Sequence, residues 1–267
     1  MILKKIVFDQ EKNVYMNAYL YEKSDELPEL KKRPAVVVCP GGGYRICSAR
    51  EADPIALKYV AQGFNTFVLY YSLNDYSVFP NSVCDLSRAL KHIRDNAEEY
   101  GVLSDKIAVC GFSAGGHVAA TLGTLWNDPE IQKAAGVSGE ENRPNAMILG
   151  YAVTSTKWIY TNDDDFPIIR SIPPEKRAER LDCAGNIGDH TPPAFLFHTQ
   201  EDNTVPVTDS LDFARAMIDK GRPCELHIFP NGWHGLSLAT KLTGAEFDDV
   251  AQWMPLSVNW LKRTFDF

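Results

Sequence analysis

The sequence lacks any apolar run approaching the roughly 18 residues that a membrane-spanning helix needs. Its first ten residues carry two lysines and an aspartate, so we expect no apolar centre of a secretory signal peptide there. Positive charge is also scarce, because 27 Lys and Arg residues face 35 Asp and Glu residues, for a formal net charge of −8 at pH 7. Binding to nucleic-acid phosphates needs a concentrated basic face. We therefore expect neither a membrane nor a nucleic-acid partner.

The six cysteines form no C-x-x-C pair and have none of the spacings of a zinc site. Cys39 and Cys110 end apolar runs, which is typical of buried free thiols. We therefore expect a cytoplasmic protein, because the reducing cytoplasm keeps such thiols free. The alternative is a disulfide in an exported protein. We expect no metal and no organic cofactor.

Apolar runs of strand length alternate with segments of helical periodicity along most of the chain. An antiparallel pair over Lys4–Phe8 and Val14–Tyr21 is followed by six predicted strands: PAVVVCP, NTFVLYYSL, KIAVCG, NAMILGY, PAFLFHT and CELHIFP. Helices are predicted over Glu51–Gln62, Ser82–Tyr100, Ala114–Leu125, Pro206–Lys220 and Glu246–Arg263. This alternation indicates a single α/β domain over residues 1–267, with a mostly parallel sheet of about eight strands and helices on both faces.

One long segment, Thr154–Thr191, interrupts the alternation between two predicted strands. It contains an acidic run at Asp163–Asp165, the pair Pro173-Pro174 and a short helical stretch around Glu175–Leu181. Structureless loops of this length are uncommon and often cover a functional site. We expect a cap insertion here, and a plain surface excursion is the alternative.

A single serine, Ser113, stands in the pattern G-x-S-x-G between a predicted strand and a predicted helix. In a nucleophile elbow, a strained turn at this junction displays the serine hydroxyl. Its neighbours two positions away must lack bulk, which explains Gly111 and Gly115. The helix N-terminus also brings free N–H groups near a developing oxyanion. A tight turn with an incidental serine is the alternative.

A serine hydroxyl needs a base to take its proton, and the base needs an acid to orient it. His234 follows the last predicted strand in a loop between two glycines, from which it can reach back over the sheet. His198 ends a predicted strand and is the second choice. Asp202 follows that strand and is the expected acid, with the adjacent Glu201 as the alternative.

Together these motifs resemble those of α/β-hydrolases, and the likeness runs nearly from end to end. CPGGGY is similar to the HGGG loop of hormone-sensitive-lipase-like esterases, and CGFSAGGH to their GDSAGG elbow. EDNTVP and WHGL resemble their acid and base loops. Pro40 and Phe112 depart from those motifs, and the long N-terminal helical cap is missing. The departures favour the small bacterial esterases of the acetyl-xylan-esterase-like or BD-FAE-like group.

The resemblance implies an oxyanion hole from the N–H groups of Gly42, Gly43 and Ala114, and a triad of Ser113, Asp202 and His234. It also implies a serine carboxylesterase that removes short acyl groups, acetyl above all, from a sugar. The expected pocket aromatics are Tyr44, Trp158 and Trp233, for each of which plain packing is an equal alternative. A prolyl-oligopeptidase-like peptidase and a non-catalytic binding module are the competing functions. The oligomeric state stays open, a homodimer included.

Overall fold

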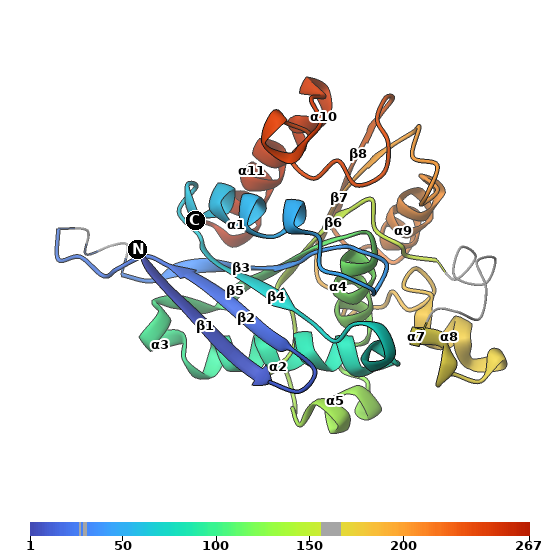
Figure 1. The fold of residues 1–267 in the computed structure, drawn as a ribbon, viewed down its shortest axis with the longest axis horizontal. Coiled ribbons are helices and arrows are strands. Elements are labelled where there is room, and N and C mark those ends of the chain that lie inside the picture. The colour runs from blue at the N-terminus through green and yellow to red at the C-terminus, as the bar shows by residue number, and fades with distance from the viewer. Residues whose placement is uncertain (27, 29–30, 156–166) are drawn as a thin grey trace.

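The computed structural model describes residues 1–26, 28, 31–155 and 167–267, in which eight strands form one sheet (Figure 1). Its order is β1-β2-β4-β3-β5-β6-β7-β8. The strands are β1 Ile2–Asp9, β2 Val14–Leu20, β3 Arg33–Cys39, β4 Asn65–Tyr70, β5 Val102–Phe112, β6 Ala146–Gly150, β7 Ala194–Thr199 and β8 Cys224–Phe229. Both pairings of β2 are antiparallel and all the others are parallel. The predicted opening pair and the mostly parallel sheet are confirmed.

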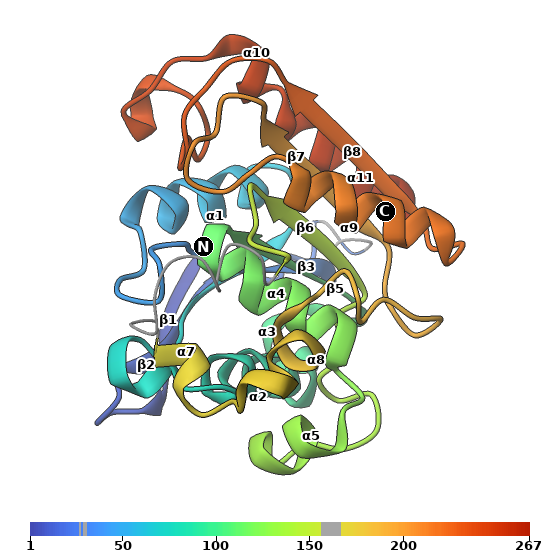
Figure 2. The ribbon, with the colours of Figure 1, turned by 90° about the vertical axis from the view of Figure 1, so that its right-hand side faces the viewer.

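Helices cover both faces of the sheet, as the alternation predicts (Figure 2). The longer ones are α1 Asp53–Val60, α2 Asn81–Asp95, α4 Ser113–Leu125, α9 Thr208–Asp219 and α11 Trp253–Phe265. The shorter ones are α3 Ala97–Tyr100, α5 Pro129–Ala135, α7 Pro167–Arg170, α8 Arg177–Leu181 and α10 Asp248–Ala251. Side chains of α1 and α11 pack on one face, and those of α2, α4 and α9 on the other. Within the described ranges, no helix is long and apolar enough to cross a membrane.

Two helical predictions need correction, and one helix was not predicted. The helix predicted over Ser82–Tyr100 breaks at Asn96, whose backbone leaves the helical region (φ −108°, ψ 19°) and whose side-chain amide donates to the carbonyl of His92. The closing helix predicted over Glu246–Arg263 is divided into α10 and α11. Pro255 has no N–H to donate to the carbonyl of Ala251, the last residue of α10. The missed helix α5 has an aspartate cap at Asp128, which accepts hydrogen bonds from two N–H groups of the first turn.

The predicted cap lies partly outside the described residues, which exclude 156–166 and with them Trp158 and Asp163–Asp165. Its described part holds α7, the short 3-10 helix Pro174–Lys176 and α8. The end of α8 is tied to α4, since the carbonyl of Leu181 accepts a hydrogen bond from Nε2 of His117 at 3.0 Å. The segment therefore packs beside the helix that begins at Ser113, and its function as a cap stays a prediction.

The ends of four strands bring separate loops to one edge of the sheet. The parallel register pairs Cys39 of β3 with Gly111 of β5, so the glycine loop after β3 lies next to the turn that holds Ser113. Strands β7 and β8 also run parallel, and Thr199 pairs with Phe229. In open sheets of this kind, ligands bind outside the carboxyl ends of the strands. The edge formed by these loops is therefore the place to examine for a site.

Candidate active site

Ser113 lies where β5 passes into α4, and its backbone is strained. Its φ of 51° falls in the left-handed region, which a residue with a side chain rarely adopts, so the predicted strain at this turn is confirmed. The need for small neighbours is confirmed as well. A Cβ on Gly115 would lie 2.2 Å from the carbonyl oxygen of Cys39, and one on Gly111 would lie 2.3 Å from that of Gly115. Only glycine lets the elbow pack this closely against the end of β3.

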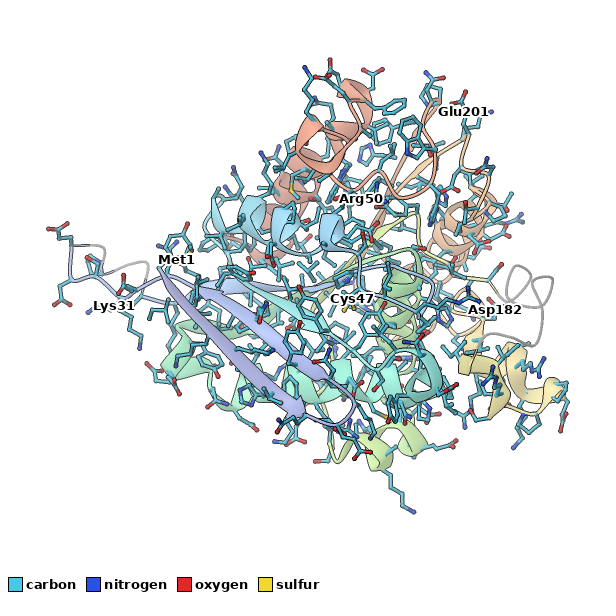
Figure 3. All side chains as sticks on the ribbon, in the orientation of Figure 1. Met1, Lys31, Cys47, Arg50, Asp182 and Glu201 are labelled. Atoms are coloured by element: carbon cyan, nitrogen blue, oxygen red, sulfur yellow. The ribbon has the colours of Figure 1, made fainter. Side chains whose placement is uncertain are left out.

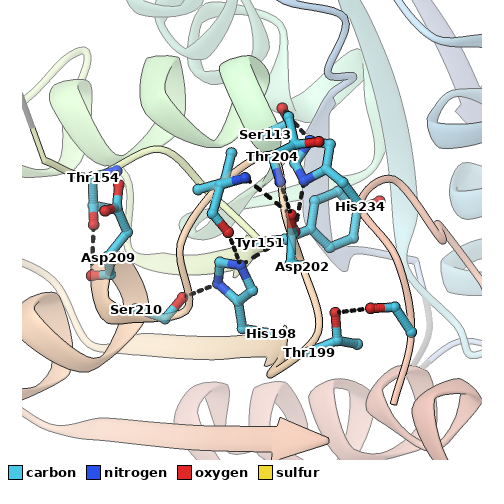
Figure 4. Close-up of polar contacts among 12 residues, drawn as sticks. Ser113, Tyr151, Thr154, His198, Thr199, Asp202, Thr204, Asp209, Ser210 and His234 are labelled. Carbon is cyan, nitrogen blue, oxygen red and sulfur yellow. Dashed lines mark hydrogen bonds and ion pairs between the residues drawn. The ribbon is translucent and has the colours of Figure 1, made fainter. Parts of the chain in front are cut away.

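The structure brings His234 to Ser113 from the loop after β8. Nε2 of His234 lies 2.8 Å from Oγ of Ser113 (Figure 4). Glycines on both sides, Gly232 with φ 132° and Gly235 with φ 82°, supply backbone conformations that side chains disfavour. The two glycines let this short loop turn the imidazole back over the sheet edge.

Asp202 holds the other nitrogen of the ring, with its Oδ2 2.6 Å from Nδ1 of His234. Its Oδ1 accepts hydrogen bonds from the N–H groups of Thr204 and Val205, both at 2.9 Å. Burial alone would raise the pKa of Asp202, but the hydrogen bonds from His198 and His234 outweigh it and hold that pKa well below its usual value. An ionised carboxylate only accepts, so Nδ1 carries the imidazole proton and Nε2 is left to accept from the serine hydroxyl.

The second-choice residues occupy different places. His198 is fully buried, where its Nε2 donates to the carbonyl of Val205 and its Nδ1 accepts from Ser210. It also lies 3.3 Å from the carboxylate of Asp202, so it supports the acid and does not face the serine. Glu201 is exposed at the periphery (Figure 3), and its carboxylate accepts from the N–H of Gly232. Neither residue hydrogen-bonds to the hydroxyl of Ser113, which bonds to His234.

The predicted oxyanion donors lie on two segments that meet at Ser113. Gly42 and Gly43 follow β3, and Ala114 is in the first turn of α4, where N–H groups have no partner inside the helix. Among the described residues, none accepts a hydrogen bond from the N–H of any of these three. The role of these three N–H groups as oxyanion donors stays a prediction.

The predicted pocket aromatics differ in exposure. Tyr44 is buried, and its hydroxyl donates to Nδ1 of His117 at 2.7 Å, so it ties the glycine loop to α4. Trp233, next to His234, is 52% exposed and packs edge-on against Phe247. Trp158 lies outside the described residues. A role in binding substrate stays a prediction for all three.

Sequence reasoning missed a buried carboxylate behind the site, Glu51. It accepts hydrogen bonds from the N–H of Gly41 and the hydroxyl of Tyr151. Burial raises the pKa of Glu51, and its hydrogen bonds and the nearby His234 oppose this rise. In the sequence it reads only as an acidic residue at the start of a helix, so no local signal marks it. No group of three or more His, Cys, Asp and Glu side chains in the described ranges could hold a metal ion.

Comparison with known proteins identifies relatives of this chain. Residues 26–217 match the model of the BD-FAE family. Endo-1,4-beta-xylanase B of Butyrivibrio fibrisolvens is 33% identical over 84% of this chain, and the acetylxylan esterase of Xylanibacter ruminicola is 30% identical over 85%. The chain spans only 35% and 46% of the lengths of these two relatives. A crystal structure of MGS-M1, an alpha/beta hydrolase from a deep-sea metagenome library, is 36% identical, has a TM-score of 0.82 and is covered over 99% of its length.

Proposed function

Because this chain belongs to the BD-FAE family and has the α/β-hydrolase fold, we propose that it is a serine carboxylesterase that hydrolyses short-chain acyl esters. The observation that carries the proposal is the unbroken chain of hydrogen bonds from Asp202 through His234 to Ser113, at 2.6 and 2.8 Å. A base hydrogen-bonded to its nucleophile and oriented by an acid is what covalent acyl transfer requires.

In the proposed reaction, Oγ of Ser113 attacks the ester carbonyl while Nε2 of His234 takes the hydroxyl proton. The carbonyl oxygen becomes an oxyanion and accepts hydrogen bonds from Gly42, Gly43 and Ala114. Each such donor contributes about 3 kcal/mol to lowering the barrier. Asp202 stabilises the imidazolium without taking its proton.

Collapse of the intermediate breaks the bond to the alcohol, which leaves with the proton held by His234. The acyl group stays on Ser113 as an ester. A water molecule then gives a proton to His234 and attacks this ester in the same geometry. The carboxylic acid departs, and the serine hydroxyl is restored.

We propose O-acetyl groups on sugars or oligosaccharides as the substrates. An acetylxylan esterase is among the relatives, which supports this class. The exposed ring of Trp233, adjacent to His234, supports it too, because an aromatic face suits the apolar face of a sugar ring. An acetyl group also needs no extended apolar tunnel, whereas an octanoyl chain does.

The test is a series of p-nitrophenyl esters from acetyl to octanoyl, together with acetate release from acetylated xylo-oligosaccharides. We expect kcat/KM to fall steeply with chain length and acetate to appear. Faster turnover of octanoyl than of acetyl esters, with no acetate from any acetylated sugar, would contradict the sugar-ester substrate and leave the esterase mechanism intact.

We also propose a cytoplasmic location. The supporting observation is that all six cysteines are free thiols, of which Cys39, Cys84, Cys110 and Cys183 are buried. Fractionation of cells that produce the native protein tests this, and recovery outside the cytoplasm would contradict it.

A further inference from the structure

A buried chain of hydrogen bonds joins the glycine loop to the histidine loop behind the three site residues. Its centre is the side chain of Glu51, which is 3% exposed. Oε2 of Glu51 accepts from the N–H of Gly41 at 2.7 Å, and Oε1 accepts from the hydroxyl of Tyr151 at 2.6 Å. The oxygen of that hydroxyl in turn accepts from the N–H of Ser237 at 2.9 Å. One carboxylate thus reaches two loops that are far apart in the sequence.

At the first end of the chain, Glu51 fixes the peptide that presents an oxyanion donor. The N–H of Gly41 is held by Glu51 and its carbonyl accepts from the N–H of Ser48 at 2.9 Å. The next N–H along the chain is that of Gly42. Gly41 also packs against the elbow, because a Cβ there would lie 2.9 Å from Cβ of Ser113. Glu51 therefore sets the position of the glycine loop against the serine.

At the second end, Tyr151 supports the imidazole of His234. The two rings meet edge to face, with centroids 5.1 Å apart and planes at 71° (Figure 4). The loop is anchored three residues beyond His234, at Ser237, whose Oγ donates to the carbonyl of Arg50 at 2.5 Å and whose carbonyl accepts from the indole of Trp253 at 2.8 Å. The hydroxyl of Tyr151 holds the N–H of the same anchor residue.

The negative charge of Glu51 supports the proposed reaction, as its hydrogen bonds do. A buried carboxylate is costly unless it is hydrogen-bonded, and Glu51 has donors for both of its oxygens. Among the described residues, Asp202 bonds to the ring of His234, the carboxylate of Glu51 interacts with that ring electrostatically, and the guanidinium of Arg50 lies beside the next residue, Gly235. Glu51 is thus a second negative group near the ring that becomes positive during the proposed reaction.

We propose that Glu51 is a positioning residue of this esterase, which holds the oxyanion donors and the imidazole in one shared geometry through Gly41 and Tyr151. This inference rests on the proposed function. It predicts that Glu51 contributes to turnover more than to substrate binding, because its side chain is buried and both of its oxygens are already bonded to Gly41 and Tyr151.

Glu51→Gln is the most specific substitution, because it keeps the shape of the side chain and removes its charge. Its single oxygen can accept from only one of the two donors, Gly41 or Tyr151, and its NH2 group must face the other. Tyr151→Phe removes the middle of the chain while leaving the ring against His234. The matched controls are Asp85→Asn, a buried carboxylate bonded to Ser72, and Tyr59→Phe, a buried hydroxyl bonded to Ser257.

The experiment measures kcat and KM for p-nitrophenyl acetate from pH 5 to 9, with thermal unfolding of every variant. Glu51→Gln should lower kcat about 10-fold to 100-fold, with KM changed less than about threefold, since small misplacements of reacting groups cost that much. The acidic limb of its kcat/KM profile should move to lower pH, because one negative charge near the imidazolium is gone. The double variant Glu51→Gln/Tyr151→Phe should lose little more kcat than the worse single variant, because the two residues belong to one chain of hydrogen bonds.

Folded Glu51→Gln and Tyr151→Phe with kcat within twofold of wild type would overturn the inference. Equal losses in Asp85→Asn and Tyr59→Phe would also overturn it, because they would show loss of stability alone. An acidic limb that does not move would overturn it as well, because Glu51 would then have no influence on His234. If the wild-type protein itself hydrolyses no ester, the proposed function fails instead, and the two failures are thereby distinguished.

Discussion

Replacing Asp202 by asparagine should move the proton of the neutral His234 ring from Nδ1 to Nε2. Oδ1 of Asp202 accepts two N–H groups, from Thr204 and Val205. An asparagine oxygen must take that same place, because turning the amide would aim its NH2 group at two donors. The NH2 group then faces Nδ1 of His234, 2.6 Å away in the native structure. Nδ1 becomes an acceptor, the proton moves to Nε2, and Nε2 can no longer take the proton of Ser113.

The expected loss in kcat is about 10⁴-fold, as for a serine-protease triad in which the same change fixes the wrong tautomer. That factor corresponds to about 5.4 kcal/mol of activation free energy. Glu201→Gln is the matched control, because its oxygen can still accept from the N–H of Gly232 and its side chain is exposed. This control should keep kcat within about threefold.

The assay is steady-state hydrolysis of p-nitrophenyl acetate by both variants, with circular dichroism to show that each is folded. A larger loss in Glu201→Gln than in Asp202→Asn would move the acid role to Glu201. A loss below tenfold in folded Asp202→Asn would refute the tautomer argument itself.

Three further outcomes follow from the same geometry. Activity should fall as pH drops through the histidine range, since protonated His234 cannot accept a proton, and a flat kcat/KM profile from pH 5 to 8 would contradict this. The pKa of Asp202 is lowered in the folded state, so its ionisation stabilises the fold above the usual aspartate pKa of about 4. This contribution to the free energy of unfolding is lost as pH falls further. In denaturant unfolding, the free energy of unfolding of Asp202→Asn should therefore decrease less with falling pH than that of the wild type. Gly115→Ala should cost about 1–3 kcal/mol of stability and most of the activity, because its Cβ would meet the carbonyls of Cys39 and Pro40. Gly185→Ala, where the added Cβ makes ordinary contacts, should change neither activity nor melting temperature.

The sequence predicted the sheet and the loops at its edge because their signals are local. A continuous apolar run marks each buried strand, and glycines mark the turns on which Ser113 and His234 stand. Helix boundaries were less predictable. The break at Asn96 depends on one side-chain bond to His92, and periodicity continues across it. Helix α5 was missed although Asp128, Pro129 and Gly136 are strong start and stop residues, because the helix is short.

The supporting residues of the site could not be predicted from local pattern. Glu51 and Tyr151 are 100 positions apart, and their hydrogen bond exists only because β3 and β6 end at the same edge of the sheet. Likewise, the sequence offered His198 as an alternative base, and only the fold shows it buried beside Asp202. Contacts between residues far apart in the sequence can be recognised only once the order of the strands in the sheet is known.

Covalent labelling shows whether Ser113 is the nucleophile. A fluorophosphonate should add once to the wild-type protein, abolish its esterase activity, and map to Ser113 by peptide mass spectrometry. Ser113→Ala should fold, take no label and lose on the order of a thousandfold or more in kcat, while the exposed control Ser138→Ala is labelled normally. Labelling of a different residue, or near-wild-type turnover by purified Ser113→Ala, would show that Ser113 is not the nucleophile.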